Sequence, residues 1–177
     1  MIEGFHEFDE FDVPVSGATI HGRRGGAGPP LLLLHGFPET HVIWHRVAPT
    51  LAREFTVVAT DLSGFGDSTS SGDQSTRELG RHQVEAMKQL GYGDFALVGH
   101  DRGARCAERG VRRIMCPTLV LWEQEGAVGR WYGDPLDIWR GWADDVTGGP
   151  VDAGHFLAEE APDETLAWLL PFLEVGS

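Results

Sequence analysis

The chain has few basic side chains, and this shortage limits the partners that it can bind. Lysine and arginine together number 14 among 177 residues, against 27 aspartates and glutamates, which gives a formal net charge of -13. A surface of this sign repels phosphate backbones and anionic lipid head groups. We therefore expect neither nucleic acid nor a membrane as a partner.

Long hydrophobic runs and cysteine clusters are also missing. The longest purely aliphatic run, residues 31–34, is far shorter than the roughly 20 residues that cross a bilayer, and residues 1–10 are acidic where a secretion signal would be basic. The two cysteines, Cys106 and Cys116, form no pattern of disulfide or zinc-ligand spacing. We expect a cytoplasmic protein without a disulfide, a metal ion or a cofactor.

Short apolar segments alternate with helical patterns along the chain. Residues 31–34, 56–60 and 95–98 are mainly apolar and bounded by turn residues, which is typical of strands buried on both faces of a parallel sheet. Residues 42–53 and 75–90 between them carry apolar side chains at spacings of three and four, as helices do. This alternation predicts the α/β class, with a mostly parallel, doubly wound sheet.

The two ends of the chain extend this pattern. Residues 7–24 read as two antiparallel strands broken at Ser16 and Gly17. After Pro117 the pattern predicts, in order, a strand, a helix, a short strand and a closing helix, at residues 118–122, 135–143, 145–151 and 162–173. The length suits one core, and we expect residues 1–177 to form a single domain.

An aspartate occupies the centre of a predicted strand-to-helix bend. Residues 99–103 read Gly-His-Asp-Arg-Gly, the G-x-nucleophile-x-G spacing that lifts the central side chain, here Asp101, to the edge of a sheet. A carboxylate there can displace a leaving group from a saturated carbon, which favours halide displacement or epoxide opening. Aspartate is also a good helix N-cap, and the residue alone does not distinguish the two roles.

Two more loops follow predicted strands and supply the groups that such a nucleophile needs. Residues 35–38 read His-Gly-Phe-Pro, and the backbone N–H of Phe37 is expected to form an oxyanion hole with the N–H of Arg102. His155, between Gly154 and Phe156, follows the last strand and is the candidate base. A lone histidine after a strand is more often structural, and it is the bend and the oxyanion loop that favour catalysis.

Four segments together resemble the haloacetate (fluoroacetate) dehalogenases of the α/β-hydrolase fold: residues 35–40, 99–105, 135–140 and 154–162. The resemblance covers the chain up to about Ala107 and again from about Cys116. It implies that Asp101 attacks the halogen-bearing carbon, that His155 activates the hydrolytic water, and that Arg102 and Arg105 bind the carboxylate of a small substrate.

Arginines line one face of the helix that follows the bend. Arg102, Arg105, Arg109 and Arg112 lie three, four and three residues apart, so an acidic chain carries a local cationic stripe that begins next to Asp101. For Arg109 and Arg112 a solvated basic helix face is the simpler interpretation.

The chain departs from the resembled family in its middle. Between residues 107 and 116 a family member continues with another strand, the acid of the catalytic triad and a helical cap, and eight residues cannot hold these. We therefore expect a minimal α/β-hydrolase fold with no cap domain. In the loop after Trp122 the acid position falls on Gly126, which leaves Glu125 as the nearest substitute and Glu123 as the second, although either is more commonly a solvated loop charge.

Three functions stay open at this point. The first is a haloacetate dehalogenase-like hydrolase, impaired by the loss of the cap and the triad acid. The second is an epoxide hydrolase or esterase, although Arg102 stands where epoxide hydrolases commonly have tryptophan. The third is a catalytically dead deletion product that only binds small carboxylates. The deletion should also bring the strand at 118–122 beside the strand at 95–98, and an exposed sheet edge or apolar face otherwise favours a homodimer.

Overall fold

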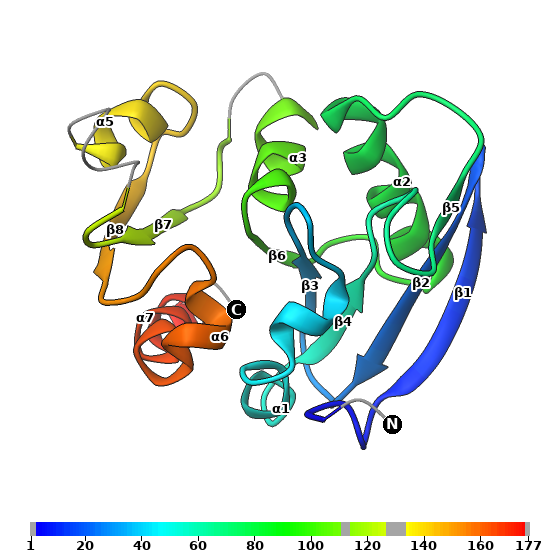
Figure 1. Cartoon of the computed structure of the whole chain (residues 1–177), viewed down its shortest axis with the longest axis horizontal. Coiled ribbons are helices and arrows are strands. Elements are labelled where there is room, and N and C mark those ends of the chain that lie inside the picture. The colour runs from blue at the N-terminus through cyan, green and yellow to red at the C-terminus, as the bar shows by residue number, and fades with distance from the viewer. Residues whose placement is uncertain (1–2, 111–113, 127–133, 176–177) are drawn as a thin grey trace. The chain divides into compact units, whose positions relative to one another are not determined.

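A six-stranded sheet lies at the centre of the first of two units into which the chain divides, residues 1–110 and 111–177. The computed structural model in Figure 1 describes residues 3–110, 114–126 and 134–175. The strand order is β1-β2-β4-β3-β6, and the short strand β5 pairs with β2. These strands span Asp9–Val15 (β1), Ala18–Gly25 (β2), Pro30–Leu34 (β3), Thr56–Thr60 (β4), Thr69–Ser70 (β5) and Ala96–Gly99 (β6).

Parallel pairing brings three carboxyl ends to one edge of this sheet. Strand β3 pairs in parallel with β4 and with β6, and Leu34 is the partner of both Thr60 and Gly99. Strands β1 and β2 form the expected antiparallel hairpin, and β2 runs antiparallel to β4. The expected α/β fold is confirmed, as a mixed sheet whose parallel part carries the loops that follow β3, β4 and β6.

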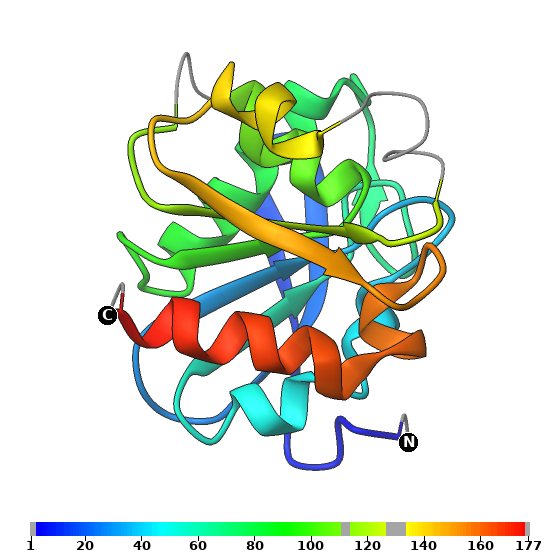
Figure 2. The same cartoon turned by 90° about the vertical axis from the view of Figure 1, so that its left-hand side faces the viewer.

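Helices cover the strands of the first unit on both sides. Helices α2 (Thr76–Gln89) and α3 (Arg102–Gly110) pack against each other on one side, and α1 (Ala48–Leu51) lies on the other (Figures 1 and 2). Helix α2 begins as expected, because the Ser75 side chain accepts a hydrogen bond from the Glu78 N–H.

The continuous helix predicted at residues 42–53 is wrong. The structure has a 3-10 helix, η1, at His41–Trp44, and then α1, in which Pro49 occupies the first turn. Proline lacks the N–H that a helix interior needs and its ring clashes with the preceding turn, so the helix must restart there.

Leucine side chains of β3 tie the sheet to both helices of one layer. All four of them, Leu31 to Leu34, are at most 2% exposed. One buried cluster joins β3 and β4 to α2 and α3, through Leu32, Leu34, Val58, Leu62, Leu79, Met87 and Cys106. Each large side chain buried in this way stabilises the fold by about 1.5–3 kcal/mol. The edge that carries the site therefore rests on a rigid core.

The second unit contains a parallel pair of strands with helices around it. Strands β7 (Thr118–Glu123) and β8 (Val146–Val151) pair along their full length. The helices are α5 (Pro135–Arg140), α6 (Leu157–Glu160) and α7 (Pro162–Val175). The strands and helices predicted after residue 117 are thus confirmed. A pairing of β7 with β6 would join the two units, and it stays a prediction, as does the single domain.

Both cysteines are free, and Cys106 is buried while Cys116 is exposed. Every helix in the described ranges is too short or too polar to cross a membrane.

Candidate active site

Asp101 lies where β6 turns into α3, and its backbone has the left-handed conformation, with a φ of 44°. In the described part of the chain every other residue with positive φ is glycine. For an L-residue this conformation costs about 1–2 kcal/mol. The His100 N–H donates to the Leu34 carbonyl at 2.9 Å and the Gly103 N–H to the His100 carbonyl at 2.7 Å, which hold the bend. An ordinary N-cap has extended backbone, so this geometry favours the elbow over the cap.

Glycines around Asp101 leave no room for a side chain. A Cβ on Gly99 would lie 2.5 Å from the Ala104 nitrogen, and one on Gly103 would lie 2.3 Å from the Leu34 carbonyl oxygen. A Cβ on Gly36 would lie 2.6 Å from the Cβ of Asp101 itself. The bend can therefore form only because its two flanks and the facing loop lack side chains.

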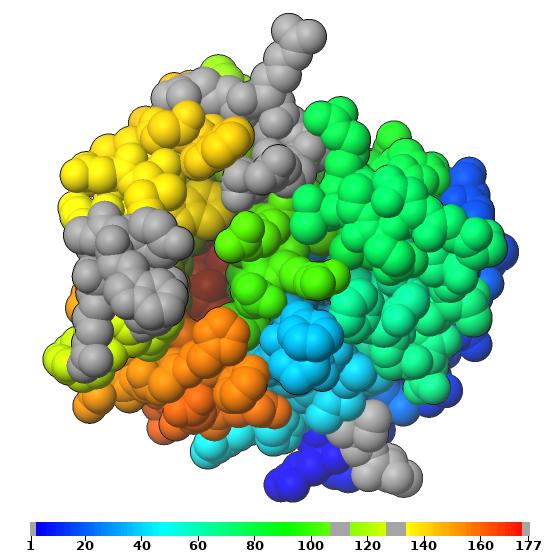
Figure 3. All heavy atoms as spheres, turned by 45° about the horizontal axis from the view of Figure 1, so that its top comes forward, coloured from blue at the N-terminus to red at the C-terminus, as the bar shows by residue number. Residues whose placement is uncertain are grey.

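The loop after β3 presents a backbone donor to the Asp101 carboxylate. The Phe37 N–H donates to Oδ2 of Asp101 at 2.9 Å. The other oxygen, Oδ1, accepts no hydrogen bond from any described residue. On the surface the loop at residues 35–40 (light blue) lies directly against the start of α3 (green) in Figure 3. One carboxylate oxygen is thus held by the predicted oxyanion loop, while the other is open to a ligand.

Glu39 connects this loop to the bend, a role that the sequence interpretation missed. Its Oε2 accepts hydrogen bonds from the Gly36 N–H and from Nδ1 of His100, both at 2.9 Å. The side chains of Glu39 and His100 are only 9% and 13% exposed. Because Gly36 precedes Phe37 and His100 precedes Asp101, the Glu39 carboxylate fixes the donor and the nucleophile relative to each other.

His35 contacts the same loop through one ring nitrogen and the loop after β4 through the other. Its Nδ1 lies 2.7 Å from the Gly36 carbonyl oxygen, and its Nε2 accepts a hydrogen bond from the Leu62 N–H at 2.9 Å. The proton of this imidazole is therefore on Nδ1. Burial lowers the pKa of His35 below its ordinary value of 6.5, against the effect of the Gly36 carbonyl, which raises it. A neutral ring thus links the loop after β3 to the loop after β4.

Arg102 supplies a positive charge next to the nucleophile. Its Cζ atom lies 5.5 Å from the centroid of the Phe37 ring and 5.6 Å from that of Phe65. Contacts of a guanidinium with two rings orient it at little entropic cost. No carboxylate in the described ranges pairs with this guanidinium, so its donors are open to a ligand.

The other arginines of the predicted stripe follow Arg102 along the chain. Arg105 is exposed and lies one turn further along α3, and its binding of a substrate carboxylate stays a prediction. Arg112 and the side chain of Arg109 lie outside the described residues.

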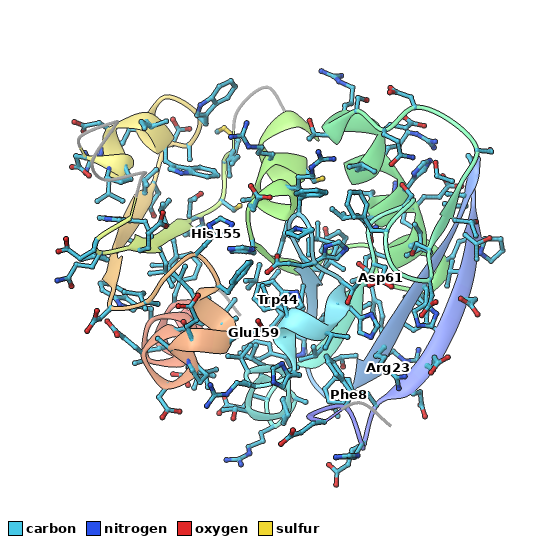
Figure 4. All side chains as sticks on the ribbon, in the orientation of Figure 1. Phe8, Arg23, Trp44, Asp61, His155 and Glu159 are labelled. Carbon is cyan, nitrogen blue, oxygen red and sulfur yellow. The ribbon has the colours of Figure 1, made fainter. Side chains whose placement is uncertain are left out.

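His155, labelled in Figure 4, lies in the second unit on the loop between β8 and α6. It is exposed, and its ring makes an edge contact with Phe156 at a centroid distance of 5.2 Å. The Glu160 carboxylate accepts hydrogen bonds from the Gly154 N–H at 2.8 Å and the Phe156 N–H at 3.0 Å. Glu160, which the sequence interpretation also missed, therefore fixes the backbone on both sides of the imidazole.

Glu125, the substitute acid, lies exposed in the turn after β7, and Glu123 ends that strand half-buried. Asp101 and His155 belong to different units, so their approach stays a prediction, as does the role of Glu125.

Known proteins resemble both the elbow and the whole chain. A model of the alpha/beta hydrolase fold family matches residues 29–109. The chain also superimposes on a solved structure from Nostoc sp PCC 7120, provisionally assigned as an alpha/beta hydrolase. The TM-score is 0.90 and the identity 30%, over 96% of this chain and 99% of that one. The chain belongs to the alpha/beta hydrolase fold family.

The curated relatives of this chain include two kinds of enzyme. It is 46% identical over 111 residues to a fluoroacetate dehalogenase of Burkholderia sp, which covers 59% of this chain and 36% of that protein. It is 36% identical over 102 residues to a soluble epoxide hydrolase of Corynebacterium sp. (strain C12), covering 57% of this chain and 36% of that one. The matches thus span only about a third of the length of these relatives, and they support a hydrolase without fixing its substrate.

Proposed function

We propose that this hydrolase displaces halide from a small halocarboxylic acid through an ester on Asp101. The observation that carries the proposal is the Asp101 carboxylate on its strained bend, with Oδ2 bonded to the Phe37 N–H. The guanidinium of Arg102, which pairs with no carboxylate among the described residues, lies over the ring of Phe37, whose own N–H holds Asp101. We also propose that the ligand is a small carboxylate and that the protein is located in the cytoplasm.

The free oxygen of Asp101 is the one that attacks in this proposal. A substrate carboxylate pairs with Arg102, and with Arg105 if that side chain turns toward it, which orients the halogen-bearing carbon. Oδ1 of Asp101 forms a bond to this carbon while the carbon–halogen bond breaks, and the halide leaves with the electron pair. Oδ2 then becomes the carbonyl oxygen of the ester, already within hydrogen-bond distance of the Phe37 N–H.

Water completes the reaction by attacking Cγ of Asp101, not the substrate carbon. His155 takes a proton from this water, and the negative charge develops on Oδ2, where the Phe37 N–H and the neighbouring Arg102 N–H stabilise it. Collapse breaks the bond between Cγ and Oδ1, and the proton on His155 passes to the departing alkoxide. The carboxyl group left on Asp101, which now contains the water oxygen, releases the second water proton to solvent, so the products are a 2-hydroxy acid, a regenerated carboxylate and a proton.

Hydrolysis of the ester should be the slow step. No triad acid occupies its family position, and in serine proteases disabling that partner lowers turnover by roughly four orders of magnitude. The first step needs no base, so the ester should accumulate. Activated chlorides and bromides suit this chain better than fluorides, because fluoride departure needs several donors in a closed site.

An epoxide hydrolase is the second candidate, supported by the 36% identity to the enzyme of Corynebacterium sp. (strain C12). Opening an epoxide would use the same Asp101 oxygen and would leave no halide. A chain that only binds small carboxylates is the third candidate, and a homodimer through a free strand edge stays a prediction.

Intact-mass measurement after incubation with chloroacetate tests the proposal. Haloacetates also alkylate thiols and Cys116 is exposed, so the experiment should use a Cys116→Ser background. We expect a mass gain of one carboxymethyl group, mapped to Asp101 and removed by hydroxylamine, which cleaves esters but not thioethers.

Asp101→Asn in the same background is the matched control, because it keeps the shape of the side chain and should remain unmodified. An equal mass gain in this variant would refute the proposed nucleophile. No mass gain and no halide release, with weak carboxylate binding, would favour the third candidate, and turnover of an epoxide would favour the second.

A further inference from the structure

Aromatic rings from two loops lie against the guanidinium of Arg102. Phe37 follows β3 and Phe65 follows β4, while Arg102 begins α3 after β6. Because β3 pairs in parallel with both β4 and β6, the three loops meet at one edge of the sheet. The guanidinium carbon lies 5.5 Å and 5.6 Å from the two ring centroids, and the rings meet edge to face with their centroids 6.4 Å apart. Each of the three groups therefore contacts the other two.

The two rings differ in how firmly the fold holds them. The side chain of Phe37 is 56% exposed. Phe65 is half-buried, and it packs against the buried cluster that joins β3 and β4 to α2 and α3. Its ring also makes an edge contact with the fully buried ring of His35, at a centroid distance of 5.7 Å. Phe65 is thus the anchored support of the group, and it contacts both the guanidinium and the more exposed ring.

The loop that carries Phe65 is fixed at Asp61, which is labelled in Figure 4. Oδ1 of Asp61 accepts a hydrogen bond from the His41 N–H at 2.7 Å, and Oδ2 accepts one from the Asp67 N–H at 3.0 Å. The Phe65 N–H itself donates to the Leu62 carbonyl at 2.9 Å. Backbone hydrogen bonds on both sides of Phe65 therefore determine where its ring lies before any ligand binds.

A ring orients a guanidinium without cancelling its charge. The chain has 27 acidic side chains, so a freely turning arginine would find carboxylates to pair with, and such a pair would occupy its donors. An aromatic face attracts the cation through its quadrupole and leaves the charge in place. Arg102 pairs with no carboxylate among the described residues. The two rings therefore hold a positive charge that is available to an anionic ligand.

We propose that Phe65 is a positioning residue that sets the preference of this site for anionic substrates, by holding the guanidinium of Arg102 over Phe37. The inference rests on the proposed function, in which Arg102 pairs with the substrate carboxylate. Without the Phe65 ring the guanidinium is free to turn, so a carboxylate must order it on binding, and the affinity falls. A neutral substrate forms no such pair and does not depend on the ring.

Titration with acetate at low ionic strength tests the inference without a chemical step, and the Nε–H resonance of Arg102 reports binding. Acetate should shift this resonance in the wild type. Phe65→Leu should raise the dissociation constant about fivefold, which corresponds to about 1 kcal/mol. Phe65→Tyr, which keeps the ring, should bind acetate as the wild type does. The matched control is Phe95→Leu, which removes another half-buried ring from the same core cluster and should leave the affinity unchanged.

Alkylation of Asp101 in the Cys116→Ser background gives a second measurement. In Phe65→Leu the chloroacetate concentration that gives half the maximal rate should rise about fivefold, while the maximal rate changes little. The rate with chloroacetamide, which is neutral, should be the same with and without the ring. A loss of packing alone would lower both rates together and would not separate the two reagents.

Unchanged acetate affinity in Phe65→Leu would overturn the inference, and so would an equal loss in Phe95→Leu or the absence of any shift at Arg102 in the wild type. An ester that forms equally well in Phe65→Leu would leave the proposed reaction standing and remove the role of Phe65. The expected acetate affinities without an ester would do the opposite. If Phe65→Leu does not fold, Phe65→Met, which fills more of the same space, replaces it in both experiments.

Discussion

Glu39 is the residue whose removal best tests how the site is built. Its Oε2 is the shared acceptor of the Gly36 N–H and His100 Nδ1. Hydrogen bonds to a charged group contribute about 1.5–3 kcal/mol each, and truncation leaves a buried donor unsatisfied. Part of this is offset, because Oε1 of Glu39 is buried without a hydrogen-bond partner among the described residues. We expect Glu39→Ala to lower the free energy of unfolding by about 2–3 kcal/mol and Glu39→Gln, which keeps one acceptor, by about 1 kcal/mol.

The same variant should slow the chemistry. Removal of an oxyanion donor costs roughly 100- to 1000-fold in rate, and Glu39→Ala loosens the Phe37 N–H without removing it. A fall of about tenfold in the rate of ester hydrolysis is therefore expected, equivalent to about 1.4 kcal/mol.

Urea unfolding followed by the fluorescence of the six tryptophans measures the first effect, and decay of the Asp101 ester by intact mass measures the second. Glu54→Ala, at an exposed glutamate of the same unit, is the matched control and should change stability by less than about 0.5 kcal/mol. If Glu39→Ala were as mild as this control in both assays, the role of Glu39 in joining loop and bend would be refuted.

Three more predictions follow from the bend, the thiols and the buried imidazole. Asp101→Gly should be more stable than Asp101→Ala by about 0.5–1 kcal/mol in urea unfolding, because alanine is strained at a φ of 44°; the reverse order, as in a helix interior, would contradict the elbow. One thiol, Cys116, should react readily with a disulfide reagent, whereas burial raises the pKa of Cys106 to about 12 and should keep it silent until unfolding. The folded-state pKa of His35 is lowered, so its contribution to stability is complete above its ordinary pKa of 6.5 and is lost as the pH falls through the lowered pKa. The urea concentration at the unfolding midpoint should therefore decrease as the pH is lowered below 6.5, and this decrease should be less steep in His35→Gln.

Local patterns predicted most of the fold, and contacts between distant residues explain what they missed. The four leucines at 31–34 predicted a buried strand, because a strand covered on both faces of a sheet has consecutive apolar side chains. The helix expected at 42–53 fails at Pro49, where one backbone donor outweighs the surrounding periodicity. His41 and Asp61 are twenty residues apart and match no motif, and their hydrogen bonds form because the parallel pairing of β3 with β4 brings the segments after these two strands together.

The site shows the same division. The spacing alone indicated Asp101, because the bend leaves no room for side chains at two positions within five residues, and glycine occupies both. Glu39 and Glu160 carry no such local signature, since each acts on the backbone of a loop through its carboxylate. The arginine stripe predicted a positive charge at Arg102. It did not predict the orientation of the guanidinium, which depends on Phe65 from the loop after β4.

The two halves of the proposed reaction depend on different parts of the chain. Asp101, the Phe37 N–H and Arg102, which would form the ester in the proposed reaction, all lie within residues 1–110. Hydrolysis needs His155, which lies in residues 111–177, beyond the place where the family's strand, triad acid and cap are missing. If the proposed reaction is correct, loss of those segments should therefore affect the alkylation step little and the deacylation step strongly. A protein with this distribution of groups should capture an activated haloacid once and release it slowly, which makes the trapped ester, and not turnover, the property by which its chemistry is most directly recognised.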